Sequence, residues 1–282
     1  MGIYRDNRCN VHGSIKLHSY LLLIVLVTAT AQAQIGLSMT PMRSDLKLSP
    51  KAQTSGPLFL SNDSGERTRV RAQIVDFFID DNGTPQFGVF AKEAPYSCRE
   101  WLTVNPMEID LEPKQQTVAR YTLRVPENVA PGANYHCSVQ YVTVPKVMAG
   151  ERVGMRVAVA VAPVFYVQVG ESKIDAQLKA LEVQPPNKAK ETGWMAVAVI
   201  ENRGLVHCRA NGKIDVLDKD GKQVEQVDIP TLPILPKRTQ MIPVALKTDL
   251  STGDFTLVIK ADLGTSEIQG GRVSISSGTV AK

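Results

Sequence analysis

The chain has 282 residues and a formal charge of +4 at pH 7, with 32 lysines and arginines against 28 aspartates and glutamates. That length is enough for two domains of ordinary size, each with its own hydrophobic core. The basic residues do not form clusters, so the charge balance gives no indication of a nucleic-acid partner or of an anionic membrane surface.

The N-terminus has the pattern of a secretory signal peptide. Three basic residues precede position 17, an apolar run extends from Leu21 to Val27, and an Ala-Gln-Ala sequence ends at Ala33. The run is too short to span a bilayer, and no later segment approaches 18 uninterrupted apolar residues. We therefore predict a signal peptide over residues 1–33, cleavage after Ala33, and a periplasmic mature chain without stable membrane insertion.

From Ile35 onward, short alternating segments rich in Val and Thr are separated by Pro, Gly, Asn and Asp. This pattern indicates an all-β chain, and a helical period is conceivable only over residues 174–181. The strands predicted in the first half are Leu37–Met42, Gly56–Ser61, Arg69–Ile79, Gln86–Phe90, Leu102–Val104, Thr117–Val125, Tyr135–Val144 and Val153–Val169. Those predicted in the second half are Ile174–Val183, Trp194–Glu201, Lys213–Leu217, Gln223–Val227, Thr239–Leu246, Phe255–Ala261 and Gly271–Ser276.

The stretch from Leu111 to Val144 indicates the type of β fold. A turn at Pro113 precedes an alternating strand, and a Pro-Gly turn ending at Gly132 precedes a second strand. Tyr135 lies two residues before Cys137, which is the spacing of the tyrosine corner in immunoglobulin-like sandwiches. We therefore expect an immunoglobulin-like fold.

The two halves of the chain share a series of turn residues. The corresponding positions are Asn62 and Asn202, Gly83 and Gly221, Pro113-Lys114 and Pro236-Lys237, Gly132 and Gly253, and Tyr135 and Phe255. Two tandem sandwiches explain this series better than one large barrel, although chance similarity among β proteins is an alternative. The predicted domains are residues 34–170 and residues 171–282.

Cysteine positions predict one disulfide. Cys9 leaves with the signal peptide, so Cys98, Cys137 and Cys208 remain in an oxidising compartment. Successive antiparallel connections alternate between the ends of a sandwich, which brings the segment of Cys98 to the same end as the turn before Cys137. We predict a Cys98–Cys137 bridge, with two separate buried thiols as the alternative. Cys208 is expected to be a buried thiol or, less simply, an intermolecular partner.

The residues give little support for catalysis or metal binding. In His136-Cys137 and His207-Cys208, neighbouring strand residues point to opposite faces, so each pair can offer only one ligand to a common ion. No Gly-x-Ser-x-Gly elbow and no glycine-rich phosphate loop occurs. We expect no enzyme, no cofactor and no metal site, and we expect both histidines to be partly exposed strand residues.

The predicted strand Val153–Val169 is apolar on both faces over its first nine residues. One face carries Val153, Met155, Val157, Val159 and Val161, and the other carries Gly154, Arg156, Ala158 and Ala160. A strand with solvent on one side normally shows polar residues there. Either both faces are covered within the protein, or the strand is an edge that accepts a strand from another polypeptide.

These features together resemble the PapD-like periplasmic chaperones of pilus assembly. The residues that carry the resemblance are Leu37-Ser38-Met39-Thr40-Pro41, Ser61-Asn62, Leu111 with Pro113-Lys114, Val125-Pro126, Pro131-Gly132 with Tyr135, and Phe165-Tyr166. The resemblance implies a long strand that lends hydrophobic residues to an incomplete pilus subunit, and a basic pair that anchors the subunit's carboxylate. This chain departs from the pair: Pro41 follows Thr40, the nearest arginine is Arg43, and the lysine position falls near Pro163.

We therefore expect a non-enzymatic chaperone-like protein that binds secreted or pilus subunits by strand addition. The predicted partner-binding residues are Val153, Met155, Arg156, Val157, Val159, Val161 and Arg43. The alternative is a structural or adhesive envelope module that binds cell-wall polymer or a surface protein, as two-domain surface proteins of Gram-positive bacteria do. Trp101 would be a recognition residue in that alternative, although packing under its own loop is the simpler interpretation.

Overall fold

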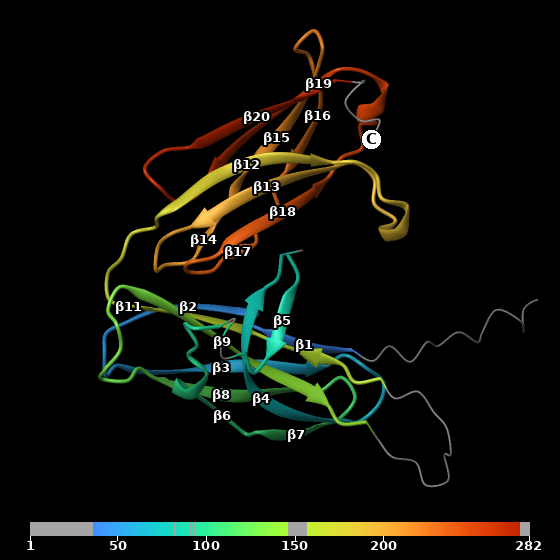
Figure 1. Ribbon diagram of the computed structural model, residues 1–282. Coiled ribbons are helices and arrows are strands. Elements are labelled where there is room, and N and C mark those ends of the chain that lie inside the picture. Colours follow the sequence, from blue (N-terminus) through green and yellow to red (C-terminus); the bar gives the residue numbers. More distant parts are fainter. Residues whose placement is uncertain (1–35, 82, 91, 93, 146–156, 277–282) are drawn as a thin grey trace, which may run out of the picture.

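The computed structural model describes residues 36–276 except 82, 91, 93 and 146–156, with the backbone alone at Lys190. The described chain is all-β with three short 3-10 helices, and its strands form two immunoglobulin-like sandwiches joined after Gly170 (Figure 1). The predicted fold class is confirmed. No helix among the described residues is both long enough and apolar enough to cross a membrane. The predicted signal peptide lies outside the described residues.

The first sandwich has two sheets. One has the strand order β1 (Leu37–Thr40), β3 (Gln53–Asn62), β8 (Gln116–Arg124) and β6 (Leu102–Asn105). The other has the order β2 (Arg43–Leu48), β11 (Val164–Val169), β9 (Ala133–Thr143), β4 (Thr68–Ile79) and β5 (Pro85–Gly88), with β7 (Glu108–Leu111) and β10 (Ala160–Val161) paired to β4 and β9. Alternate residues of β3 and β8 are buried, as a half-buried strand requires.

The start of the first sandwich differs from the prediction. A single strand over Leu37–Met42 is wrong, because β1 ends at Thr40 and pairs with β3 in one sheet. The chain then passes through a cis Thr40–Pro41 peptide, and β2 pairs in parallel with β11 in the other sheet. Proline has no N–H to donate to a neighbouring strand. A change of sheet at Pro41 therefore leaves no backbone N–H of that residue without a partner. The strands β2 and β7 were not predicted.

The predicted strand Val153–Val169 is confirmed in part: β10 and β11 pair with β9 in one continuous register, Ala160 opposite Val142 and Val164 opposite Ser138, but the two residues between them are not part of a strand. β10 ends at Val161, and β11 begins at Val164. Between them, Pro163 has no N–H to donate, and its carbonyl accepts from the Val139 N–H at 3.2 Å and the Ser138 hydroxyl at 2.8 Å. Residues 153–156 lie outside the described part of the chain.

The second sandwich repeats the architecture on a smaller scale. One sheet has the order β12 (Ala176–Gln184), β13 (Met195–Asn202) and β18 (Thr239–Ala245), and another has the order β16 (Gln223–Asp228), β15 (Asn211–Asp218), β19 (Phe255–Asp262) and β20 (Gln269–Ile275). The short strands β14 (Cys208–Arg209) and β17 (Pro233–Ile234) form a further pair that was not predicted. The second sandwich buries its own hydrophobic core, separate from that of the first.

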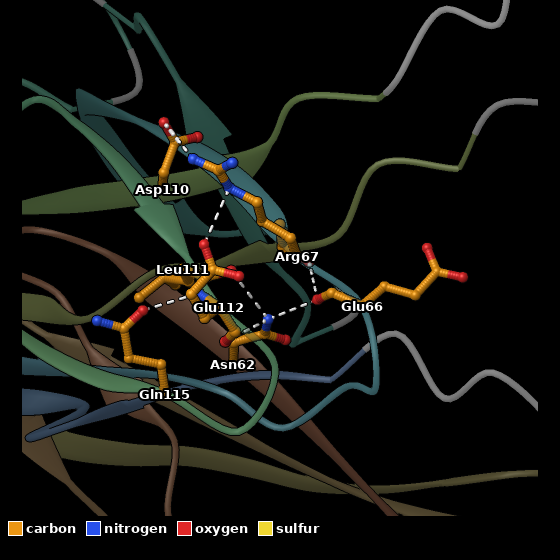
Figure 2. A network of polar contacts seen from close by, with 8 residues as sticks. Asn62, Glu66, Arg67, Asp110, Leu111, Glu112 and Gln115 are labelled. Carbon is orange, nitrogen blue, oxygen red and sulfur yellow. Dashed lines mark hydrogen bonds and ion pairs between the residues drawn. The ribbon is translucent and has the colours of Figure 1, made fainter.

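A buried asparagine organises one turn in each sandwich. The Asn62 amide donates to the carbonyls of Glu66 at 2.7 Å and Glu112 at 3.1 Å (Figure 2). Its oxygen accepts from the Ser64 N–H at 3.0 Å. Asn202 does the same in the second sandwich, with the carbonyl of Val206 at 2.8 Å as one acceptor. An amide offers two donors and an acceptor, so one side chain satisfies a buried turn that would otherwise lack partners.

A lysine stands next to each of these turns in an equivalent place. Lys114 and Lys237 both have a positive φ, of 61° and 59°. Their ammonium groups donate to the carbonyls of Asp63 and Arg203, each of which directly follows the buried asparagine. The asparagines and lysines matched by sequence thus have the same local role in both sandwiches, whereas the matched glycines differ, with a φ of 80° at Gly132 and of −179° at Gly253.

The predicted disulfide between Cys98 and Cys137 is present, with an S–S distance of 2.08 Å. Next to it, Tyr135 hydrogen-bonds with the backbone of Ala130, which is the tyrosine-corner arrangement. The segment around Cys98 is additionally bound to β9, because the His136 N–H donates to the Tyr96 carbonyl at 2.8 Å. Cys208 is a buried free thiol.

Replacing either buried asparagine by alanine is expected to lower the free energy of unfolding by about 3 kcal/mol, because two carbonyls and one N–H would lose their buried partner. Urea denaturation of Asn62→Ala and Asn202→Ala measures the loss. Asn211→Ala is the matched control, since the Asn211 side chain is exposed on β15. Equal midpoints for all three variants would contradict this role.

Removing the disulfide with Cys98→Ala/Cys137→Ala is expected to lower the stability of the first sandwich by about 4 kcal/mol, because a loop of 39 residues is no longer closed in the unfolded chain. Urea unfolding of the oxidised protein and of the double variant gives the difference. The reduced wild-type protein serves as the control and should unfold near the variant. A loss under about 1 kcal/mol would contradict the estimate.

Candidate functional site

Strand β10 pairs with β9 on one side, and no described strand pairs with its other side. It pairs with β9 in the register Ala160 to Val142 and Val161 to Tyr141, and the Thr143 N–H donates to the Val159 carbonyl at 2.9 Å. Strand β1 lies near β10 but pairs with β3. The segment from Val157 to β10 is therefore an edge within the described chain.

The predicted binding residues on this edge differ in exposure. Val157 is 58 % exposed, and Ala158 and Ala160 are exposed. Val159 is partly buried, and Val161 packs partly against the first core. Val153, Met155 and Arg156 lie outside the described residues. An apolar edge with exposed valine and alanine side chains offers both backbone groups and hydrophobic surface to a partner strand.

Strand β2 determines where this edge ends. It runs parallel to β11 from Arg43, opposite Val164, to Leu48, opposite Val169, and so occupies the side of β11 away from β9. The Val164 N–H donates to the Met42 carbonyl at 3.0 Å, which completes this pairing at the proline break. A strand placed in line with β2 and parallel to it would run along β10, with its carboxyl end next to Arg43.

Arg43, the last of the predicted binding residues, has its side chain about half exposed and forms an ion pair with Asp45 at 2.7 Å. A second arginine, Arg209 of β14, extends over the ring of Tyr166, with its guanidinium carbon 4.9 Å from the ring centre, and forms a hydrogen bond with Tyr166. Arg209 was not predicted, because it comes from the second sandwich on a two-residue strand with no sequence signal of its own.

The contact between the two sandwiches is called here the domain joint. Its hydrophobic part is a small cluster of Phe77, Tyr166 and Leu235, each nearly inaccessible to solvent. Hydrogen bonds also cross it: the Asn134 N–H donates to the Leu205 carbonyl at 2.7 Å, and the Gln240 amide donates to the Asp80 carbonyl at 2.8 Å. The hairpin between β4 and β5 extends toward the second sandwich and supplies part of this contact (Figure 1).

Both histidines of the described chain lie at the domain joint. The prediction of partial exposure is wrong for His136, which is 2 % exposed, and only 13 % of the His207 side chain is exposed. Burial lowers the pKa of each to about 3, further lowered for His207 by Arg209. The sequence could not place them together, because His136 stands on β9 of the first sandwich and His207 directly precedes β14 of the second.

Trp101 packs against its own domain. Its ring centre lies 4.4 Å from that of Tyr135, and both rings lie against the first hydrophobic core. This is the simpler of the two interpretations that the sequence left open. Among the described residues, no group of three or more His, Cys, Asp and Glu side chains is arranged to hold a metal ion.

Comparison with known proteins finds similar structures only. No protein-family model and no curated protein matches the sequence. The class 5 fimbriae chaperone CfaA is 14 % identical over 85 % of this chain and 98 % of its own, with a TM-score of 0.42. The Escherichia coli chaperone DraB is 13 % identical over 86 % and 98 %, with a TM-score of 0.41. A complex of the Salmonella enterica SafA pilin with the SafB chaperone matches at 14 % identity over 87 % and 99 %, with a TM-score of 0.43.

The residues on which the family resemblance was based have defined places in the structure. Pro41 marks the change of sheet between β1 and β2, Asn62 organises the turn after β3, and Phe165-Tyr166 lies in β11 between β2 and β9. The fold comprises two sandwiches in series. The solved structures to which the chain is similar include two chaperones, the fimbriae chaperone CfaA and the chaperone DraB, at 13 to 14 % identity.

Proposed function

We propose that this protein is a non-enzymatic periplasmic chaperone that binds secreted pilus subunits by strand addition along Val153–Val161. The observation that carries the proposal is the unpaired side of β10, next to exposed Val157, Ala158 and Ala160. A subunit strand that pairs there would gain backbone hydrogen bonds and cover these apolar side chains.

The position of β2 supports one direction for the added strand. Because β2 already pairs in parallel with β11, a subunit strand in the same orientation continues the sheet without a change of direction. Its carboxyl end then reaches Arg43. Arginine presents N–H donors in a fork that matches a carboxylate, so Arg43 is proposed to bind the terminal carboxylate of the subunit, with Arg209 as the second basic group at the joint.

A charge on the proposed binding edge is expected to abolish capture of the subunit. Val157→Asp would place a carboxylate where the partner strand covers an apolar side chain, and burial of an unpaired charge is costly. Co-purification from periplasm with a co-expressed pilus subunit, quantified by mass spectrometry, should fall at least about tenfold, a change equivalent to ~1.4 kcal/mol.

Val224→Asp is the matched control for that experiment. Val224 is a valine of similar exposure on β16 of the second sandwich, at 46 % against 58 % for Val157. Its replacement should leave capture unchanged. Full capture by Val157→Asp would contradict strand addition at this edge, and equal loss in both variants would show that surface charge alone affects capture.

The role proposed for Arg43 predicts a dependence on the partner's terminal carboxylate. Arg43→Ala should weaken binding of a peptide from the subunit's C-terminus by about tenfold or more, because a charge-assisted hydrogen bond of roughly 1.5–3 kcal/mol is lost. The same peptide with a C-terminal amide should bind wild type and variant alike. Isothermal titration of the four combinations measures the coupling, and zero coupling would contradict the role of Arg43.

A further inference from the structure

Both ring nitrogens of His207 form hydrogen bonds at the domain joint, and the one at Nδ1 crosses to the first sandwich. Its Nδ1 lies 2.8 Å from Oδ1 of Asn134 in the first sandwich, and its Nε2 lies 2.7 Å from Nη1 of Arg209. A guanidinium can only donate hydrogen bonds, so Nε2 accepts and Nδ1 carries the proton that is donated to Asn134. A proton added at Nε2 would turn this acceptor into a donor, which would then face the N–H donor of Arg209.

The charges around His207 oppose protonation. Arg209 and Arg43 are its cationic neighbours, and the ring stacks on Tyr166 with 4.3 Å between centres. One carboxylate favours a charged ring, since Oδ1 of Asp45 lies 3.7 Å from Nε2. That carboxylate is half exposed and already paired with Arg43 at 2.7 Å. Its attraction for a charged ring therefore does not offset the repulsion from two arginines and the loss of hydration on burial.

His136 stands on the first-sandwich side of the joint and is nearly inaccessible to solvent. Neither ring nitrogen has a hydrogen-bond partner among the described residues. Its ring meets Phe77 edge-on at 5.2 Å. The charged or titratable groups that face it are His207, Arg238 and Asp76.

Asp76 is the one anion facing His136, and it is already engaged. It accepts from the Phe90 N–H at 3.0 Å and from the Ser97 hydroxyl, and Arg99 stands 3.7 Å away. A protonated His136 would therefore be a buried cation without a free partner in the described chain, which is a strongly unfavourable state.

We propose that the domain joint is an acid-operated hinge: protons taken up by His136 and His207 place like charges on opposite sides of the joint and let the sandwiches separate while each stays folded. A charged His136 of the first sandwich would face His207 and Arg238 of the second, and a charged His207 would face Arg43 of the first. Separation exposes both imidazoles to water, where they accept protons readily. The large cores lie inside the individual sandwiches, whereas the hydrophobic cluster at the joint has three buried side chains, with Phe78, Phe87 and Val164 partly buried against them. The inference is independent of the proposed function, because it concerns the chain without a partner.

The sign and steepness of the effect follow from proton linkage. Each histidine has its ordinary pKa near 6.5 in the open arrangement and a pKa of about 3 in the closed one. Closure is therefore favoured above pH 6.5 and weakens as the pH falls. Between these two values, each histidine multiplies the ratio of open to closed protein by about ten per pH unit, and the two together by about one hundred.

Small-angle X-ray scattering of the protein purified from periplasm tests the hinge. As the pH is lowered from 7.5, the radius of gyration of the wild-type protein should rise before the near-ultraviolet circular dichroism of the folded sandwiches is lost. His136→Phe/His207→Gln removes both titrating rings, keeps an aromatic ring beside Phe77 and retains an acceptor for Arg209. This variant should stay compact at the pH at which the wild type expands.

His207→Arg tests the opposite change, because a permanent cation beside Arg209 should expand the protein already at pH 7.5. Should the double variant fail to fold, His207→Gln alone is the second measurement, and it should reduce the pH dependence of the ratio from about one hundredfold to about tenfold per pH unit. A wild-type radius that is constant until the sandwiches unfold would overturn the hinge. Expansion of the double variant at the wild-type pH would overturn it as well.

Discussion

The parallel pairing of β2 with β11 is the constraint on which the rest of the structure depends. Six residues of β2, from Arg43 to Leu48, lie beside Val164 to Val169 and complete the second sheet of the first sandwich. Because the chain enters this sheet only after Pro41, β2 covers the free side of β11 but does not extend along β10. One strand thus closes the first sandwich and also defines the edge at which we propose that another polypeptide pairs.

The same pairing brings the first sandwich to the second. Tyr166, in the middle of β11, is held between β2 and β9 with its ring toward His207 and Arg209. Burial raises the pKa of Tyr166 to about 12, so its hydroxyl keeps its proton and remains a donor at any working pH. Arg43 begins β2 close to this ring. The proposed binding edge and the domain joint are therefore adjacent, and Arg43 belongs to both.

The carboxylates at the domain joint are already engaged by other groups, so they do little to favour a charged histidine. Asp45 is paired with Arg43, Asp76 is engaged by Ser97 and Arg99, and both histidines are neutral beside arginines. A joint of this kind is held by a few directional hydrogen bonds and three buried hydrophobic side chains rather than by a large core. Such an interface is typical of domains that change their relative position.

Local patterns in the chain were sufficient for the class of fold, most strand positions, the disulfide and the matched turns. Alternation of Val and Thr with polar residues reports strands directly, because strand side chains alternate between faces, and Asn62, Asn202, Lys114 and Lys237 act within a few residues of their own turns. Features that depend on a distant partner were missed. The strands β2, β7, β14 and β17 are short and owe their existence to the strands beside them. The burial of His136 and His207 and the approach of Arg209 to Tyr166 depend on how two folded domains meet, and no local spacing in the chain records that contact.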